Sequence, residues 1–313
     1  MAMMKLVMDT PITRTYESVD ERNSMKTWIV FDVPNIAYRA YYGYGPKSQH
    51  GMKRGTLFGM LRTILEMKDR FGSLHFAFAF DEGAPFRQEI SRSYKDSRRK
   101  REAEMSAEDR ARLFEHRQQV AFLKKEVLPS IGYKNIFFKD GYEADDVIAS
   151  LVQSLRRDDV IIVSGDHDFY QLLSAGRVFV WQPIKNKLYS QELFTEEYGG
   201  LHPSDWITVK AIAGDASDGI PGVPKVGEIT AIKYLLNKLA PESKACQKIM
   251  DNKALWKANI DLIRLPYPGV GAFRLSDDTV MERDWRRVCE DIGMMSVMKE
   301  AFVSKPKSVK WYE

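Results

Sequence analysis

The chain has 313 residues, of which 44% are hydrophobic and 29% charged, enough for two modest domains with buried cores. It contains no run of about 18 apolar residues, so we expect no membrane span. The first residues lack the apolar stretch of a signal peptide, and two cysteines are too few for a disulfide framework. We therefore expect a cytoplasmic protein.

The formal net charge of +4 is mild, but the charges are segregated along the chain. Residues 95–101, KDSRRKR, hold five cations against one acid, whereas acids gather in short clusters elsewhere. This pattern indicates one surface for a polyanion and another for cations.

The predicted elements alternate between strand and helix after a polar N-terminal extension, residues 1–26. Apolar periodicity predicts a strand in TWIVFDV (27–33), a helix at 55–72 and a buried strand at 74–80. Residues 87–125 are charged and favour helix, which predicts a helical insertion on the surface. The later predicted elements are a strand at 134–138, a helix from 143, a strand at 158–164, a short helix at 169–173 and a strand at 177–181.

This alternation predicts an α/β domain at residues 27–200 with a largely parallel central sheet. From residue 201 to 313 the pattern becomes helical with Gly/Pro turns, which predicts a second, all-α region.

Nine acidic residues fall where one rim of the predicted sheet would gather them. Ligand sites in open α/β sheets lie beyond the carboxyl ends of the strands. Asp32, Asp81, Asp166 and Asp168 follow predicted strands, Glu143, Asp145 and Asp146 begin a helix, and Asp215 and Asp218 lie in AGDASDGIPGV.

The helix start GYEADDVIAS is electrostatically costly because three carboxylates fall within four residues. Two charges 4 Å apart repel by roughly 4 kcal/mol at an effective dielectric near 20, and a helix N-terminus offsets only about 0.3–1 kcal/mol per acid. Taken singly, each acid has an ordinary alternative as a turn former, helix cap or dipole complement. Together they indicate two Mg²⁺ or Mn²⁺ ions, since all donors are oxygens, and paired ions of this kind hydrolyse phosphodiesters.

At this point the chain resembles the flap endonuclease family of structure-specific 5′ nucleases, including phage-type 5′–3′ exonucleases and the 5′-nuclease domain of bacterial DNA polymerase I. The matching stretches are FDVPNIAYRA, AFDEGAPFRQE with SYKDSRR, GYEADDVIASL, VSGDHDFYQLL and AIAGDASDGIPGVPKVGEITAIKYL, in the family's order over residues 28–236. The resemblance implies a PIN-like sheet, a helical arch at about 87–125 and a C-terminal DNA-binding region of helix-turn-helix type.

The resemblance also assigns roles to individual residues. It places Asp32, Asp81, Glu143 and Asp145 mainly at one metal ion, and Asp166, Asp168, Asp215 and Asp218 mainly at the second, with Asp146 between them. Many of these contacts could run through water, because Mg²⁺ dehydrates reluctantly. Lys95 and Arg98, at the base of the arch, would add positive charge at the phosphate.

Further residues are expected to contact nucleic acid. In the arch region these are Arg87, Tyr94, Arg99, Lys100 and Arg101, and in the glycine-rich turn they are Gly222, Lys225, Gly227 and Lys233. The resemblance also implies a K⁺ ion at backbone carbonyls of that turn. The ordinary alternatives are solvated surface cations and a helical hairpin with glycine caps.

The sequence departs from the family's pattern after Asp32, where the family commonly has glycine and this chain has Val33-Pro34. Proline biases the residue before it toward an extended conformation, so we expect a rebuilt first turn.

The resemblance implies a nuclease that acts at 5′ ends, flaps or RNA primers during DNA replication. Its partners would be branched or 5′-flapped duplex DNA and RNA–DNA hybrid, with single-strand-binding protein or the replisome as protein candidates, and the chain would be a monomer. Two alternatives stay open: a PIN-type ribonuclease, and a branched-DNA-binding homologue that has lost catalysis.

Overall fold

The structure is a computed structural model in which residues 25–44, 48–49 and 52–300 are described. All but the last two residues of the expected N-terminal extension lie outside this described part. Among the described residues, no helix is long and apolar enough to span a membrane.

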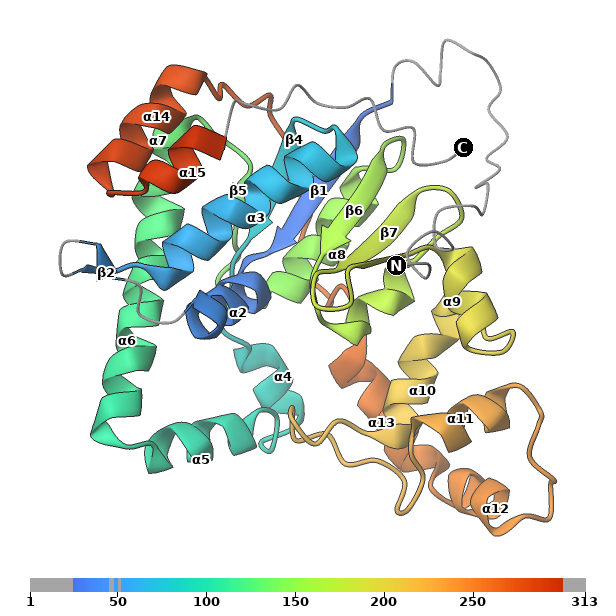
Figure 1. Cartoon of the computed structure of the whole chain (residues 1–313). Helices are drawn as coiled ribbons and strands as arrows, with labels where there is room; N and C mark the ends of the chain where they lie inside the picture. Colours follow the sequence, from blue (N-terminus) through green and yellow to red (C-terminus); the bar gives the residue numbers. More distant parts are fainter. Residues whose placement is uncertain (1–24, 45–47, 50–51, 301–313) are drawn as a thin grey trace, which may run out of the picture.

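A six-stranded sheet forms the centre of the molecule (Figure 1). Its spatial order is β5-β4-β1-β6-β7-β8, and every neighbouring pair is parallel except β7 and β8. The strands are β1 (Thr27–Asp32), β4 (His75–Ala79), β5 (Ile136–Phe137), β6 (Asp159–Val163), β7 (Val178–Gln182) and β8 (Lys187–Tyr189). A separate two-stranded sheet pairs β2 (Ser48–Gln49) with β3 (Met52–Lys53).

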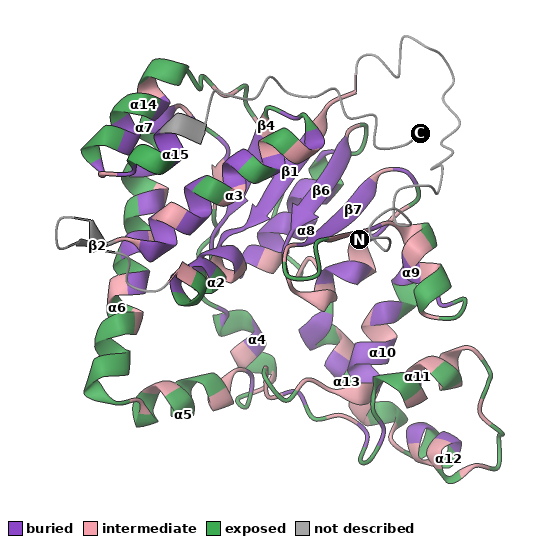
Figure 2. Ribbon diagram, viewed as in Figure 1, coloured by how far each residue is buried: buried purple, intermediate pink, exposed green. Residues whose placement is uncertain are grey.

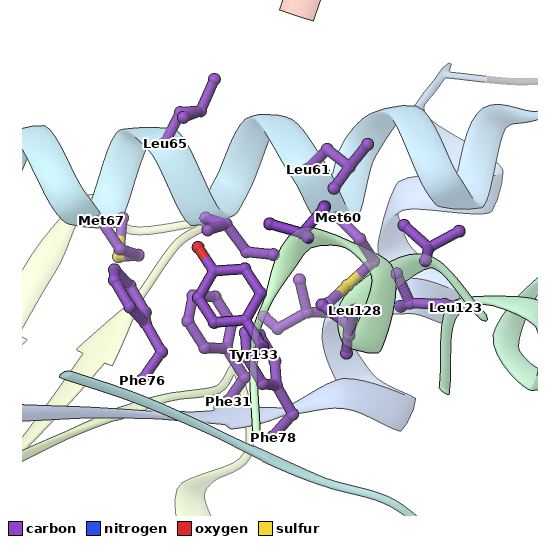
Figure 3. Packing of buried hydrophobic residues seen from close by; sticks show 14 of the residues in the cluster. Phe31, Met60, Leu61, Leu65, Met67, Phe76, Phe78, Leu123, Leu128 and Tyr133 are labelled. Carbon is purple, nitrogen blue, oxygen red and sulfur yellow. The ribbon is translucent and has the colours of Figure 1, made fainter. Parts of the chain in front are cut away.

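Helices cover both faces of the sheet (Figure 2). Alternate strand residues belong to two different cores. One core lies under α2 (Val33–Tyr44) and α3 (Gly55–Phe71), where Phe31, Phe76 and Phe78 pack against helix side chains (Figure 3). Each such fully buried side chain contributes about 1.5–3 kcal/mol. The other core lies against α8 (Ala144–Ser154).

The two helices over the first core approach each other closely at Gly59 of α3. A Cβ at Gly59 would lie 2.3 Å from the Cβ of Ala40 in α2, closer than any side chain can come. Because Gly59 has no side chain, α2 can lie this close to α3. Helix α2 begins directly after Asp32.

The predicted arch is a set of helices that leaves the sheet after β4 and returns before β5 (Figure 1). It contains α4 (Pro85–Ile90), α5 (Asp96–Glu104) and α6 (Ala107–Phe122), and α6 continues through η1 (Leu123–Val127) into α7 (Leu128–Ile131). No residue of α5 is buried, so this helix stands clear of the core (Figure 2).

The second half of the chain adds a helical region beyond the sheet. Its helices are α9 (Gln191–Glu197), α10 (Trp206–Ala213), α11 (Glu228–Leu235), α12 (Lys244–Asp251) and α13 (Lys253–Ile263), with a short 3-10 helix at Pro203–Asp205. Another 3-10 helix, His167–Leu172, connects β6 to β7. Helix α10 packs against both α11 and α13. A long turn connects α10 to α11, as the glycine-rich sequence predicts.

The last described helices depart from the predicted division at residue 200. Helices α14 (Glu282–Asp291) and α15 (Met295–Glu300) pack on α7 and α3, and Trp285 and Val288 belong to the first core. The described residues from 201 to 300 therefore do not form one separate packing unit, because α14 and α15 pack on helices of the first core.

The predicted elements are otherwise present within a few residues of their expected bounds, and the fold class is confirmed. The expectation for Val33 is wrong, because α2 begins at Val33 with Pro34 in its first turn. Proline is tolerated there, since the first N–H groups of a helix have no partner within it.

Candidate metal centre

Three of the predicted acids follow neighbouring strands of the sheet. Asp32 is the last residue of β1 and pairs in register with Ala79 of β4, two residues before Asp81. On the other side, Phe31 pairs with Val163 of β6, three residues before Asp166. Parallel register thus brings these carboxylates to one edge, as the strand-end rule predicts.

The start of α8 adds two acids to the same edge. Glu143 is the residue before the helix, and Asp145 lies in its first turn. The Asp81 Oδ1 atom accepts a hydrogen bond of 2.7 Å from the Ala144 backbone N–H, which ties the end of β4 to this helix start.

A second group gathers around Lys210, which lies in α10 and is buried. The Lys210 Nζ atom is 2.9 Å from Asp215 Oδ2 and 3.2 Å from Asp168 Oδ1. The Asp215 Oδ1 atom accepts from the Ser217 hydroxyl at 2.6 Å, and Asp166 Oδ1 accepts from the Asp168 N–H at 2.8 Å. Lys210 therefore joins the segment after β6 to the turn after α10.

Burial and mutual repulsion disfavour ionisation in the centre of this cluster. Burial raises the pKa of Asp32 to about 7 against the hydrogen bond from Ser164, and the charges of Asp81 and Asp166 add to the shift. Burial and then the charges of Asp32, Asp166 and Glu143 raise the pKa of Asp145 well above its usual value. The carboxylates thus lie close enough together to repel one another.

Two outer carboxylates show the opposite behaviour, because cations or hydrogen-bond donors stand beside them. Burial would raise the pKa of Glu143, but Lys95 and Arg87 outweigh it and lower that pKa. For Asp215 the hydrogen bonds from Ser217 and Lys210 likewise outweigh burial and lower the pKa to about 2. The uncompensated charge is therefore in the middle of the cluster.

The donors present fit a hydrated hard cation. They are all carboxylate oxygens, and the nearest cation to the buried Asp168 Oδ1 is the Lys210 ammonium at 3.2 Å. Within the described part of the chain, however, no three His, Cys, Asp or Glu side chains are close enough to hold one ion directly. This spacing suits Mg²⁺, which keeps several water ligands and takes only one or two carboxylates.

The two predicted catalytic cations lie beside this cluster. The Lys95 ammonium pairs with Glu143 Oε1 and lies 3.9 Å from Asp218 Oδ2, and Arg98 Nη2 is 2.6 Å from Asp218 Oδ1. Lys95 has a left-handed backbone (φ 56°) at the start of α5, and its N–H donates to the Asp218 carbonyl at 2.7 Å. The base of the arch is thus docked on the turn that carries Asp215 and Asp218.

Three sequence expectations are wrong, since the side chains concerned are engaged in the interior. Asp146 is completely buried, and both its oxygens accept from Arg87, at 2.6 and 2.7 Å, so it does not lie free between two metal ions. Arg87 itself is only 4% exposed and cannot reach nucleic acid. Tyr94 is also only 4% exposed, and its hydroxyl donates to Glu143 Oε2 at 2.7 Å.

The other expected nucleic-acid contacts lie at the surface. Arg99 and Lys100 are exposed on α5 but both pair with Asp96, at 3.4 and 2.9 Å, whereas the exposed Arg101 has no acidic partner among the described residues. In the turn region, Lys225, Gly227 and Lys233 are exposed. Gly222 instead packs closely, because a Cβ there would lie 2.0 Å from the Ala213 carbonyl oxygen.

Sequence reasoning missed Lys210 and Ser164. The Ser164 hydroxyl donates to Asp32 Oδ2 at 2.6 Å and stands at the end of β6. Lys210 is the single charged residue of the apolar helix WITVKAIA, immediately before the acidic turn, and that isolation was a usable signal.

Comparison with known proteins shows the family to which the chain belongs. Residues 27–199 match the model of the 5′-3′ exonuclease N-terminal resolvase-like domain. The chain is 33% identical over 220 residues to the 5′-3′ exonuclease of Buchnera aphidicola, a match covering 69% of this chain and 71% of that protein. It is also 33% identical to DNA polymerase I of Streptococcus pneumoniae over 223 residues, which cover 67% of this chain but only 24% of the polymerase.

Solved structures share the fold at lower sequence identity. A bacteriophage T5 flap endonuclease in complex with DNA and metal ions aligns with a TM-score of 0.66 and 19% identity, over 88% of this chain and 97% of that one. The catalytic core of Rad2 with a DNA substrate aligns with a TM-score of 0.55 and 17% identity, over 87% and 89% of the two chains. From the matched family model and the extent of the sequence relationship, this chain belongs to the 5′-3′ exonuclease family.

Proposed function

We propose that the chain is a divalent-metal-dependent 5′ nuclease that hydrolyses phosphodiester bonds at 5′ ends, flaps or RNA primers. The observation that carries this proposal is the convergence of carboxylates from β1, β4, α8, β6 and the turn after α10 at one edge of the sheet. Burial there raises the pKa of Asp32 and Asp145, so holding them ionised together requires added positive charge.

The proposed ions are two Mg²⁺ or Mn²⁺ ions. Asp32, Asp81, Glu143 and Asp145 would hold one, and Asp166, Asp168, Asp215 and Asp218 the other, largely through water. When bound, such ions supply an activated water and neutralise charge on the leaving oxygen. Lys95 and Arg98, which stand beside Asp218, would bind the phosphate and stabilise its developing negative charge.

The proposed path of duplex DNA leads from the arch base to the turn between α10 and α11. Gly227 is exposed immediately before α11, where the first N–H groups of the helix can donate to a phosphate. Lys225 and Lys233 flank this point, and carbonyls of the turn are the proposed site of a K⁺ ion.

The proposed substrates are branched or 5′-flapped duplex DNA and RNA–DNA hybrid. The T5 flap endonuclease and Rad2 structures that share this fold contain DNA, which supports the assignment. Action as a monomer in the cytoplasm, alongside single-strand-binding protein or the replisome, is part of the same proposal and rests on the sequence alone.

A labelled 5′-flap duplex, incubated with and without Mg²⁺, tests the proposal. We expect Mg²⁺-dependent release of the flap by the wild-type protein and no turnover by Asp166→Asn, which should still bind the DNA. The matched control is Asp140→Asn, an exposed acid outside the cluster that should cleave normally.

Each other result has a definite meaning. Tight flap binding without cleavage by the wild type would favour the non-catalytic homologue, and cutting of free RNA alone would favour a PIN-type ribonuclease. Near-normal cleavage by Asp166→Asn would remove the metal assignment.

A further inference from the structure

The first turn of α8 carries two acids that face the metal centre and a third that does not. Asp146 is 0% exposed, and its charge is met by Arg87, which is 4% exposed and comes from α4, 59 residues earlier. A protein cation therefore neutralises one of the three crowded carboxylates.

All five N–H donors of the Arg87 guanidinium are used. Nε donates to the Leu262 carbonyl at 2.9 Å, and Nη2 donates to Asp146 Oδ1 at 2.7 Å and to the Arg264 carbonyl at 3.3 Å. Nη1 donates to Asp146 Oδ2 at 2.6 Å and to Glu143 Oε2 at 3.2 Å. Arginine has five such donors, so its geometry at this position is fully determined.

The acceptor positions of Asp146 are equally filled. Besides its two bonds from Arg87, Oδ1 accepts from the Tyr267 N–H at 2.7 Å and Oδ2 accepts from the Glu143 N–H at 3.3 Å. Two oxygens with four bonds leave no lone pair directed at a metal ion. Asp146 therefore acts on the protein rather than on a ligand.

Glu143 is the residue through which this network reaches the metal centre. Its Oε2 atom accepts from Arg87 and from the Tyr94 hydroxyl, and its Oε1 atom pairs with Lys95. All three side chains come from residues 87–95, so one short segment sets the orientation of the carboxylate.

We propose that Arg87 is a positioning residue for the metal centre. By pairing with Asp146 and bridging to Glu143, it fixes the start of α8 so that Glu143 and Asp145 are presented to the ion together. It also binds carbonyls at the end of α13, which couples that helix to the same point. This inference rests on the proposed function, and partners of metal ligands of this kind typically change metal affinity or activity 10- to 100-fold when mutated.

The test is Arg87→Lys, which keeps the charge but offers three donors in place of five and no planar fork. Calorimetric titration with Mg²⁺ in the absence of DNA measures the metal affinity directly. We expect it to fall by roughly 10- to 100-fold, with a matching rise in the Mg²⁺ concentration for half-maximal flap cleavage. Binding of the flap duplex without Mg²⁺ should stay at the wild-type value.

Arg177→Lys is the matched control, since Arg177 binds the opposite end of the same helix. Its Nη1 atom donates to the carbonyls of Val152 and Leu155, at 3.3 and 3.2 Å. This variant should lower the melting temperature without changing Mg²⁺ affinity. Wild-type Mg²⁺ affinity in Arg87→Lys, or an equal loss in both variants, would overturn the proposal.

If Arg87→Lys fails to fold, a second variant tests the positioning role of Arg87. Asp146→Asn keeps the shape of the side chain and removes its charge, and it should also weaken Mg²⁺ binding; unchanged binding would overturn the inference. Where both fold, the double variant should be no weaker than Arg87→Lys alone, because the two residues act as one unit. A wild type that binds no Mg²⁺ would instead refute the proposed function.

Discussion

The arch and the C-terminal helices are both rich in basic residues, but they use them differently. On the arch, Arg112 pairs with Glu108 at 2.5 Å, and Arg117 makes two bonds to Glu102 at 2.7 and 2.8 Å. Among the described residues, by contrast, several lysines of the C-terminal helices and of the turn before α11 have no acidic partner. These are Lys225, Lys233, Lys244, Lys248, Lys253 and Lys257.

The difference shows that a count of basic residues is a poor measure of free charge. Residues 221–264 contain eight basic and four acidic side chains, a net charge of +4 that equals the formal charge of the whole chain. Exposed ion pairs such as those of the arch contribute only about 0.2–1 kcal/mol each, yet a phosphate must compete with them. We therefore expect the arch to contact DNA through its base, and the C-terminal helices to contact DNA through their lysines that have no acidic partner.

The largest expected effect is a difference in cleavage rate between substitutions at two consecutive arginines of the arch. Arg98 and Arg99 have similar side-chain exposure, 53% and 49%, but Arg98 faces Asp218 at the candidate metal centre and Arg99 faces Asp96 on α5. Arg98→Ala should lower the single-turnover cleavage rate by on the order of 10²-fold, as removal of one transition-state donor does. Arg99→Ala should cleave at nearly the wild-type rate. Equal losses of cleavage rate in the two variants would contradict the distinction between the arch base, at Arg98, and the rest of the arch.

The arch also shows what the sequence could and could not predict. The sheet was predictable because its parallel strands are buried on both faces and read as apolar runs. The strand β8, three residues long and antiparallel at the edge, carried too little pattern to be found. The arch was located from its charge and helix propensity, but its ion pairs depend on side-chain geometry that a sequence does not contain.

The candidate metal centre was likewise predictable only in part. The strand-end rule located the acids that follow β1, β4 and β6, since it depends only on where apolar runs stop. It did not find that Asp146 pairs with Arg87, because these residues are far apart in the chain and only the fold brings them together. Lys210 stands out in the sequence as the one charge of an apolar helix, but its partners Asp168 and Asp215 become known only from the folded structure.

An intermediate effect is expected where the arch base meets the turn. Gly219 has φ 71°, and a Cβ there would lie 2.2 Å from the Ser93 carbonyl oxygen. Gly219→Ala should destabilise the protein by about 1–3 kcal/mol and separate Lys95 and Arg98 from Asp218, which thermal unfolding and the cleavage rate will detect. Gly43→Ala is the control, since a Cβ there meets nothing within 4 Å and Gly43 lies in helix α2. A Gly219→Ala protein with wild-type stability and rate would show that the two regions need no close docking.

The smallest expected effect concerns the lysines without acidic partners. It is a change in the salt dependence of DNA binding and not in the cleavage rate. Removing one phosphate contact from duplex binding lowers the dependence of log K on log salt by about 0.9. Lys233→Ala should show this change at every sequence tested, because a phosphate contact carries no base preference. Lys100→Ala, which removes a lysine already paired with Asp96 at 2.9 Å, should leave the slope unchanged. The reverse result would mean that DNA displaces the acidic partners of the arch and holds it more strongly than it holds the C-terminal helices.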